Sequence, residues 1–311
     1  MFRAQLRLAA VGMTLGAQVA CGGVAVIDAP PSDGGTGGAG ATGGTGGTGA
    51  TGGTGGTGGS GGTGGTGGSG GSAGAVPGVC PGDSQAHTMV KVASPMAAAT
   101  CIAAYEVTRG QYLQWLNSVT DPPPNVPPCT WKTDHVPQLA SWPPATEELD
   151  LPVAGVDWCD AQAYCLARNR RLCGRITPVG TAVPTSSFAD YYESEWYNAC
   201  TERGAHTYPY GNAYEAFTCN GNDAGYGEPW TVGYGGACQT WNGVYDLSGN
   251  VWEWENSCSG SSGETDNCRV RGGAWNGAEA LMHCAADLLQ QRQARSPALG
   301  IRCCADPIYP D

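Results

Sequence analysis

The chain has 311 residues, a formal net charge of −12 at pH 7 and only two lysines. A strongly acidic chain of this kind has no basic stripe to neutralise phosphates, so the composition excludes nucleic acid as an expected partner. Glycine is unusually common, with 51 residues, and many of these lie close to the N-terminus.

Residues 1–20 predict an export signal. Two arginines precede an apolar run that ends in small residues, and this run is too short to span a bilayer. Cys21 follows directly, as in bacterial lipoproteins, whose cysteine at this position carries the lipid. An ordinary secretory signal is the alternative, because Gln18 stands where lipoprotein signals usually have leucine. We therefore expect lipidation of Cys21, attachment to a membrane and a location in the cell envelope, at the outer membrane or the cell surface.

Residues 21–75 predict a disordered tether. Most of this segment, residues 34–74, consists almost entirely of Gly, Thr, Ser and Ala, largely as Gly-Gly-Thr. These residues offer no apolar side chains to bury, so nothing offsets the conformational entropy that ordering would remove. The repeats are not a phosphate loop, because no strand precedes them and no helix follows.

Residues 76–311 are long enough to form one folded head with its own core. They contain 14 of the 15 cysteines, and an even count in an exported chain favours disulfides over metal binding. Cys303 and Cys304 should bond to different partners, because a ring between adjacent cysteines is strained. Proximity in the sequence suggests three further pairs, although connectivity does not follow from sequence alone: Cys80–Cys101, Cys219–Cys238 and Cys258–Cys268.

The head is predicted to contain three short helices. Thr108 can cap the first, over residues 109–118, in which Tyr112, Leu113 and Leu116 share a face. Asp157 starts the second, over residues 158–168, and the third covers residues 189–201. Strand-like pieces are short and occur at residues 87–93, 269–275 and 300–304. With ten tryptophans and few long apolar runs, we expect an α+β domain with much irregular structure, packed around aromatic rings and rich in disulfides.

Several motifs of the head follow one another in a characteristic order. They are YEVTRGQYLQWL (105–116), LPVAGVDWCDAQAYC (151–165), ESEWYNACTERG (193–204), YPYGN (208–212), GVYDLSGNVWEW (243–254), RVRGGAW (269–275) and RSPALGIRCCAD (295–306). This order resembles the formylglycine-generating enzyme, or sulfatase-modifying factor, family. The resemblance spans nearly the whole head and implies that family's variant of the C-type lectin fold.

Active members of the family need two reactive thiols, which hold copper(I) and activate oxygen. Their first cysteine follows a Gly-Gly-Ser-Trp-like turn by two residues, and the second lies five residues further on. In this chain the turn ends at Trp275, and the two positions are occupied by Gly277 and Met282. We therefore expect no catalytic residue and no copper cofactor.

The resemblance also implies two disulfides. Cys284 corresponds to a family cysteine that is bonded to the one ending the third helix, here Cys200. By the same correspondence Cys165 should bond to Cys303. The alternative for Cys284 is a reactive thiol beside His283, although adjacent residues in an extended strand point to opposite faces.

A calcium ion is the cofactor that the resemblance leaves open. Its expected ligands are the carbonyl oxygens of Ser248, Gly249 and Val251 and the carboxylate of Glu253, a donor set that suits calcium. The alternative is that Glu253 accepts hydrogen bonds from loop amides while the neighbouring tryptophans belong to the core.

Three functions are compatible with these observations. The first is a tethered, non-catalytic domain that binds a protein or glycan partner, or a substrate, in the groove of the enzyme's former chemistry. The second is an oxidoreductase of the same superfamily that uses non-haem iron. The four histidines of this chain, however, are scattered along the sequence and suggest no facial triad of iron ligands. The third is a calcium-dependent glycan-binding module, suggested by Glu228-Pro229-Trp230 and Trp241-Asn242-Gly243.

Overall fold

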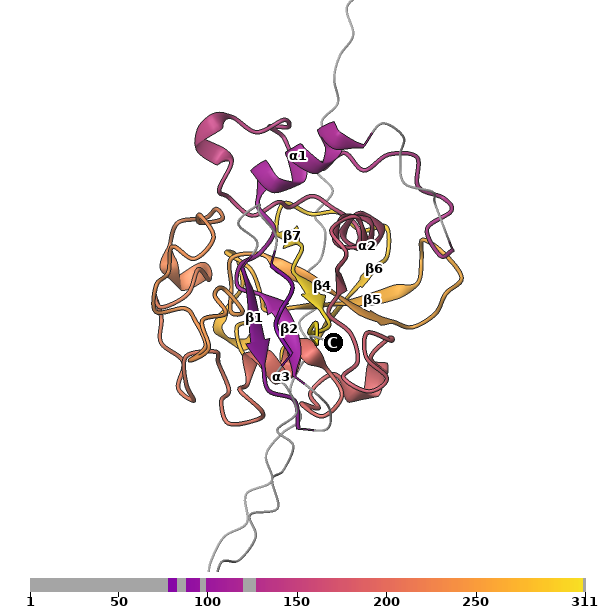
Figure 1. Ribbon diagram of the computed structural model, residues 1–311. Helices are drawn as coiled ribbons and strands as arrows, with labels where there is room; N and C mark the ends of the chain where they lie inside the picture. The colour runs from indigo at the N-terminus through magenta and orange to yellow at the C-terminus, as the bar shows by residue number, and fades with distance from the viewer. Residues whose placement is uncertain (1–77, 83–87, 96–98, 120–126, 310–311) are drawn as a thin grey trace, which may run out of the picture. The chain divides into compact units, whose positions relative to one another are not determined.

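The computed structural model describes residues 78–82, 88–95, 99–119 and 127–309 (Figure 1). Every described residue lies in one compact unit, Ser69–Asp311. The expected signal, the lipidated Cys21 and the tether up to residue 75 lie outside the described residues. Among the helices that are described, none has the length and apolar character needed to cross a membrane.

The first two helices begin where the sequence predicted. Helix α1 covers Arg109–Ser118 and α2 covers Trp158–Ala167. The Thr108 hydroxyl accepts a hydrogen bond from the backbone N–H of Gln111 at 3.2 Å, and the Gln111 side chain accepts one from the Thr108 N–H at 2.9 Å. Asp157 forms the same reciprocal capping box at the start of α2, so both starts are fixed by local hydrogen bonds.

The third helix is shorter than predicted. Helix α3 covers only Glu195–Cys200, whereas the sequence pattern indicated residues 189–201. The backbone N–H groups of Glu193 and Ser194 both donate to the carbonyl of Asp190, which closes a turn. Ser194 then has an extended backbone and caps the helix through a 3.0 Å hydrogen bond from the Tyr197 N–H, so the helix cannot begin earlier.

The strands of the described residues form two four-stranded sheets. The first has the order β1-β2-β8-β3, and its neighbours are antiparallel. The second has the order β6-β5-β4-β7, in which β4 and β7 are parallel. The strands are β1 (Met89–Val92), β2 (Thr100–Ala103), β3 (Arg171–Leu172), β4 (Trp252–Cys258), β5 (Asn267–Arg271), β6 (Leu288–Gln291), β7 (Leu299–Gly300) and β8 (Cys303–Ala305). Short 3₁₀ turns occur at Thr146–Glu148, Thr185–Ser187, Asn222–Ala224 and Glu279–Leu281.

The C-terminal strand predicted over residues 300–304 is divided between the two sheets. Its first part is β7 of the second sheet and its last part is β8 of the first. Between them the carbonyl of Ile301 accepts a hydrogen bond from the Val107 N–H, and the side chain of Arg302 turns into the interior. The chain therefore changes sheets at these two buried residues.

The largest apolar cluster contains the inner faces of α1 and α2, which lie together at one end of the described unit (Figure 1). The rings of Tyr112, Trp115 and Tyr164 contact one another, with centroids 4.9–5.5 Å apart. Leu113 and Leu116, expected on this face, are only half-buried. Trp115 is therefore the larger contributor to the core.

Seven disulfides pair all 14 cysteines of the described residues. The two pairs implied by the family resemblance are present, and so are the three suggested by proximity in the sequence. Cys303 and Cys304 have different partners, as the strain argument requires. The pairs are Cys80–Cys101, Cys129–Cys159, Cys165–Cys303, Cys173–Cys304, Cys200–Cys284, Cys219–Cys238 and Cys258–Cys268.

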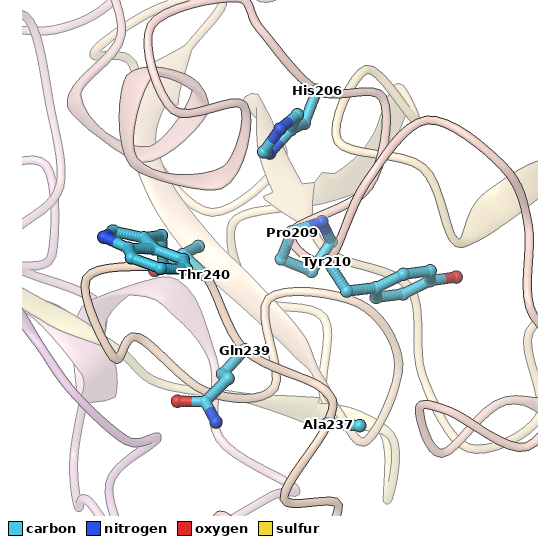
Figure 2. A pocket seen from close by; sticks show the side chains of 7 residues that line it. His206, Pro209, Tyr210, Ala237, Gln239 and Thr240 are labelled. Carbon is cyan, nitrogen blue, oxygen red and sulfur yellow. The ribbon is translucent and has the colours of Figure 1, made fainter.

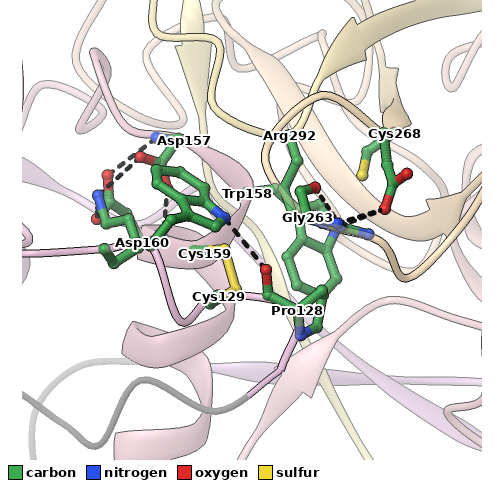
Figure 3. The surroundings of a disulfide bond; sticks show 12 residues. Pro128, Cys129, Asp157, Trp158, Cys159, Asp160, Gly263, Cys268 and Arg292 are labelled. Carbon is green, nitrogen blue, oxygen red and sulfur yellow. Dashed lines mark hydrogen bonds and ion pairs between the residues drawn. A yellow bond between two sulfur atoms is a disulfide. The ribbon is translucent and has the colours of Figure 1, made fainter.

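One of the seven fastens an irregular segment to the start of α2 (Figure 3). Cys129 bonds to Cys159, and three residues further along Lys132 reaches the capping box. Its ammonium nitrogen lies 2.7 Å from a carboxylate oxygen of Asp157 and 2.7 Å from one of Asp160. Lys132 is buried, so this ion pair is shielded from solvent and from salt.

A buried ion pair joins the two sheets. Arg302 donates to both carboxylate oxygens of Glu253 on β4, at 2.9 Å each, and its other nitrogens reach the carbonyls of Ala103 on β2 and Tyr245. The indole N–H of Trp196 completes the cluster with a 2.6 Å hydrogen bond to Glu253. Arg302 and Glu253 are 0% and 1% exposed.

Replacing Arg302 with Met should destabilise the protein by about 3–5 kcal/mol, because the Glu253 carboxylate would remain buried without its partner. The double change Arg302→Met with Glu253→Gln should recover part of that loss, since no buried charge then remains. Urea unfolding would measure both. Lys91→Met, at an exposed position on β1, is the control and should stay within about 0.5 kcal/mol of the wild type. Equal stabilities for Arg302→Met and the control would contradict the assignment.

Candidate functional site

The two most characteristic sequence motifs form one site in the structure. The turn after β5 contains Gly272 and Gly273, both in the left-handed region at φ 90° and 81°. The carbonyl of Gly272 accepts a 2.7 Å hydrogen bond from the Gly249 N–H, and the Trp275 N–H donates to the carbonyl of Asn250 at 2.9 Å. The turn at residues 272–275 therefore lies directly against the loop before β4.

Met282 fills the space at the centre of this site. Its thioether end lies among four glycines, which we call the glycine cage. A Cβ atom on Gly221 or Gly249 would lie 2.7 Å from the Met282 Cε, and one on Gly273 or Gly277 would lie 3.1 or 3.4 Å from its sulfur. Met282 is 1% exposed. The cage is therefore closed around a side chain.

Two residues of this site stand where the family's reactive cysteines are expected. Gly277 and Met282 occupy the two positions where the family resemblance requires cysteines, and the structure places them side by side. A thioether is a soft ligand, but it is neutral, and Gly277 offers no second sulfur. In the described ranges, no cluster of three or more His, Cys, Asp or Glu side chains could hold a metal ion.

The cysteine near this site belongs to a disulfide. Cys284 is bonded to Cys200 at the end of α3, and both are buried. The Cys284 N–H donates to the carbonyl of Thr207 at 2.9 Å. This hydrogen bond holds the segment around Cys284 beside the segment that follows α3. Cys284 therefore has no thiol with which His283 could pair.

The expected calcium ligands do not fit a calcium ion in this arrangement. Both oxygens of the Glu253 carboxylate are engaged: the Arg302 Nε–H donates to both at 2.9 Å, and the Trp196 N–H donates to Oε2. A terminal nitrogen of Arg302 also lies 2.7 Å from Oε1, so a guanidinium already supplies the positive charge. The alternative also needs correction, because the donors to Glu253 are side chains and not loop amides. Trp252 and Trp254 are core residues, as that alternative supposed.

Asn250 is the loop residue that the sequence reasoning missed. It has φ 62°, and its side chain donates to the Glu106 carboxylate at 2.6 Å. Its amide oxygen accepts hydrogen bonds from the Trp230 N–H and from the Asn220 side chain, at 2.8 and 3.1 Å. The signal in the sequence was an asparagine between glycine and valine, since asparagine tolerates this backbone conformation.

Two further carboxyl groups lie near Arg302. Burial raises the pKa of Asp246 to about 6. Burial also raises the pKa of Glu106 well above its ordinary value, with repulsion from Asp246 and Glu253 as the next causes. The interior of the site is therefore acidic around a single guanidinium, and Arg302 is its essential counter-charge.

The three described histidines are not brought together. His135 lies 2.9 Å from the Asp160 carboxylate beside α2, and His206 lies 3.7 Å from Glu202 after α3. His283 directly precedes Cys284, which is held in a disulfide. His87 lies outside the described residues. This arrangement gives no support to a facial iron triad.

Replacing Met282 with Ala should destabilise the protein by about 2–5 kcal/mol, because the rigid glycine backbones cannot collapse into the cavity left behind. The neighbouring Leu281, which is 37% exposed, supplies the control, and Leu281→Ala should cost about 1 kcal/mol or less. Denaturant unfolding of the two variants gives the comparison. A smaller loss for Met282→Ala than for Leu281→Ala would show that the cage is not tightly packed.

Chelation tests the interpretation of Glu253. A saturated calcium site would add about 2.7 kcal/mol at a hundredfold excess over its dissociation constant. With Arg302 in the cation's place, the melting temperature should be the same in EDTA and in millimolar calcium. Differential scanning calorimetry would measure it. A rise of several degrees on adding calcium would restore the calcium site and overturn the assignment of Arg302.

Comparison with known proteins identifies the family. Residues 77–307 match the model of the sulfatase-modifying factor enzyme 1-like domain. The protein named inactive C-alpha-formylglycine-generating enzyme 2 in Mus musculus is 35% identical over 141 residues, which are 42% of this chain and 39% of the mouse protein. Its Bos taurus counterpart is 33% identical over 42% of this chain and 40% of its own length. The chain thus spans about two fifths of the length of these relatives.

The solved structures are less similar to this chain in sequence than the two relatives are. Treponema denticola variable protein 1 is 18% identical with a TM-score of 0.47, over 71% of this chain and 95% of its own. PvdO from Pseudomonas aeruginosa is 15% identical with a TM-score of 0.46, over 71% of this chain and 92% of its own. The match to the family model confirms the family resemblance. The short helices, the strands and the seven disulfides of the described residues confirm the predicted α+β, disulfide-rich fold. The chain belongs to the sulfatase-modifying factor enzyme 1-like family.

Proposed function

We propose that this protein is an exported, lipid-anchored member of the family whose head no longer catalyses oxidation and instead binds a partner or substrate. The observation that carries the proposal is the side chain of Met282 in the glycine cage. It occupies the space that the second thiol would need, while Gly277 replaces the first. The site therefore keeps the backbone of an enzyme without its reactive groups.

Two further observations support the loss of chemistry. All the cysteines of the described head are held in disulfides, so none offers a thiolate to copper. The two curated relatives are themselves named inactive formylglycine-generating enzymes. No cluster of ligands for iron exists among the described residues, so the oxidoreductase alternative has no site in this part of the chain.

The proposed location rests on the N-terminal sequence. Residues 1–20 have the pattern of an export signal, Cys21 is the residue to be lipidated, and residues 21–75 have the composition of a flexible tether. Seven disulfides suit a protein folded in an oxidising compartment outside the cytoplasm. Such a head would be held close to the membrane and still reach partners at some distance from it.

Thiol titration tests the chemical part of the proposal. The folded mature protein should react with no equivalents of Ellman's reagent and should not convert the cysteine of a sulfatase peptide to formylglycine in the presence of copper(I). The variant Gly277→Cys with Met282→Cys is the positive control for the titration and should yield thiols. Two reactive thiols in the wild type, or any conversion of the peptide, would overturn the proposal.

The lipid anchor has its own readout in the same preparation. Mass spectrometry of the non-reduced mature protein should find a chain that begins at Cys21 with a lipid on it. Cys21→Ala should move the protein from the membrane fraction to the soluble fraction, because one acylated residue supplies the membrane affinity. An unmodified Cys21 in the wild type would exclude the anchor but leave the non-catalytic head untouched.

A further inference from the structure

A cavity of about 330 Å³ lies between residues 206–210 and 237–241 (Figure 2). This volume is at the lower end of the range for small-molecule sites, which is about 300–1,000 Å³. Aromatic and uncharged polar side chains line it, and no Lys, Arg, Asp or Glu is among them. The cavity is therefore suited to a small neutral ligand.

Trp241 is the most unusual residue of its lining. The side chain is 92% exposed, more than any other large apolar side chain in the described residues. Leaving a tryptophan in water forgoes the free energy of its burial, which makes such a ring a common feature of binding surfaces. Singly exposed apolar residues do occur without function, so the support beneath this ring is decisive.

The backbone beneath Trp241 is held rigidly. Its N–H donates to the carboxylate of Glu202 on the opposite segment. The Thr240 N–H donates to the carbonyl of Val244 at 3.0 Å, and the Thr240 hydroxyl accepts from the Val244 N–H at 3.1 Å. The turn closes at Gly243, with φ 83°. The exposed ring thus sits on an ordered hairpin, so little conformational entropy of the backbone is lost on binding.

The opposite wall is equally supported. Tyr208 and Gly211 exchange two backbone hydrogen bonds, at 2.8 and 3.1 Å, which turn the chain tightly at Pro209 and Tyr210. The ring of Tyr210 stacks on that of Tyr208, with centroids 5.5 Å apart. The Glu202 carboxylate accepts from the Trp241 N–H and lies 3.7 Å from the His206 ring, so it links this wall to the hairpin of Trp241. The two walls therefore form one preformed site.

Polar groups face the same space. The ring of His206 points towards the gap between Pro209 and Thr240 (Figure 2), and its Nδ1 lies 3.7 Å from a carboxylate oxygen of Glu202. The amide nitrogen of Gln239 donates to the Gly236 carbonyl at 2.7 Å, which orients the amide and leaves its oxygen as an acceptor. An imidazole and an amide of this kind can exchange hydrogen bonds with hydroxyl groups.

We propose that this cavity binds a neutral sugar ring of an oligosaccharide, with Trp241 as the stacking platform. A pyranose has an apolar C–H face that packs on an aromatic ring and a rim of hydroxyl groups that need hydrogen-bond partners, and the cavity offers both. An apolar ligand would not use His206 and Gln239, and an anionic ligand would find no cation in the lining. The inference names the ligand class for the proposed binding function and needs no calcium ion.

An array of neutral oligosaccharides, followed by calorimetric titration with those that bind, tests the inference on the full mature protein. Chitotriose, maltotriose and cellotriose are the first soluble probes. Trp241→Ala should weaken binding at least about tenfold, as expected for the loss of a tryptophan anchor. Because its side chain is so exposed, the variant should keep the wild-type melting temperature. Binding should be the same with and without EDTA.

Phe217→Ala is the matched control. Phe217 is 72% exposed on the same stretch of chain but does not line the cavity, so its removal should change affinity less than about twofold. Absence of binding to every neutral glycan, equal binding by Trp241→Ala and wild type, or loss of binding in EDTA would each overturn the inference. None of these outcomes bears on the thiol titration, so the non-catalytic assignment stands or falls separately.

Discussion

The buried pair of Glu253 and Arg302 is the interaction on which the rest of the head depends. Arg302 is the point at which the C-terminal segment leaves one sheet for the other, and its guanidinium contacts a strand of each. Two charges removed from water are costly unless their geometry and remaining hydrogen bonds are satisfied. Trp196 and the carbonyls of Ala103 and Tyr245 supply those bonds. The position of the loop before β4, and with it one side of the candidate site, follows from this cluster.

The two family motifs keep their contact with each other although the expected thiols are absent. The turn at Gly272 and Gly273 and the loop at Asn250 remain hydrogen-bonded to each other. What changes is the content of the space between them, where one unbranched side chain is surrounded by backbone. Methionine suits such a place because its flexible thioether adapts to an irregular gap. The frame can therefore be retained for binding while the reactive groups are absent.

Local features of this fold were predictable and contacts distant in sequence were not. The caps at Thr108 and Asp157 depend on residues three positions away, so the starts of α1 and α2 could be read from the sequence. The start of α3 depends on a turn at Asp190 that competes with the helix. The partner of Glu253 lies 49 residues further along the chain, and no spacing rule indicates it. The calcium expectation could not take Arg302 into account for that reason, since a carboxylate's role depends on which cation the fold brings to it.

The last strand has a consequence for the order of synthesis. Strand β8 lies between β2 and β3 in the first sheet, and its adjacent cysteines close disulfides with partners 138 and 131 residues earlier. Until these final residues are available, Cys165 and Cys173 remain unpaired and the middle of that sheet is missing. A chain that is synthesised from the N-terminus onwards therefore cannot complete the head until its last residues have been made. Oxidation can lock the head only after Cys303 and Cys304 are available, so formation of β8 controls when these two disulfides close.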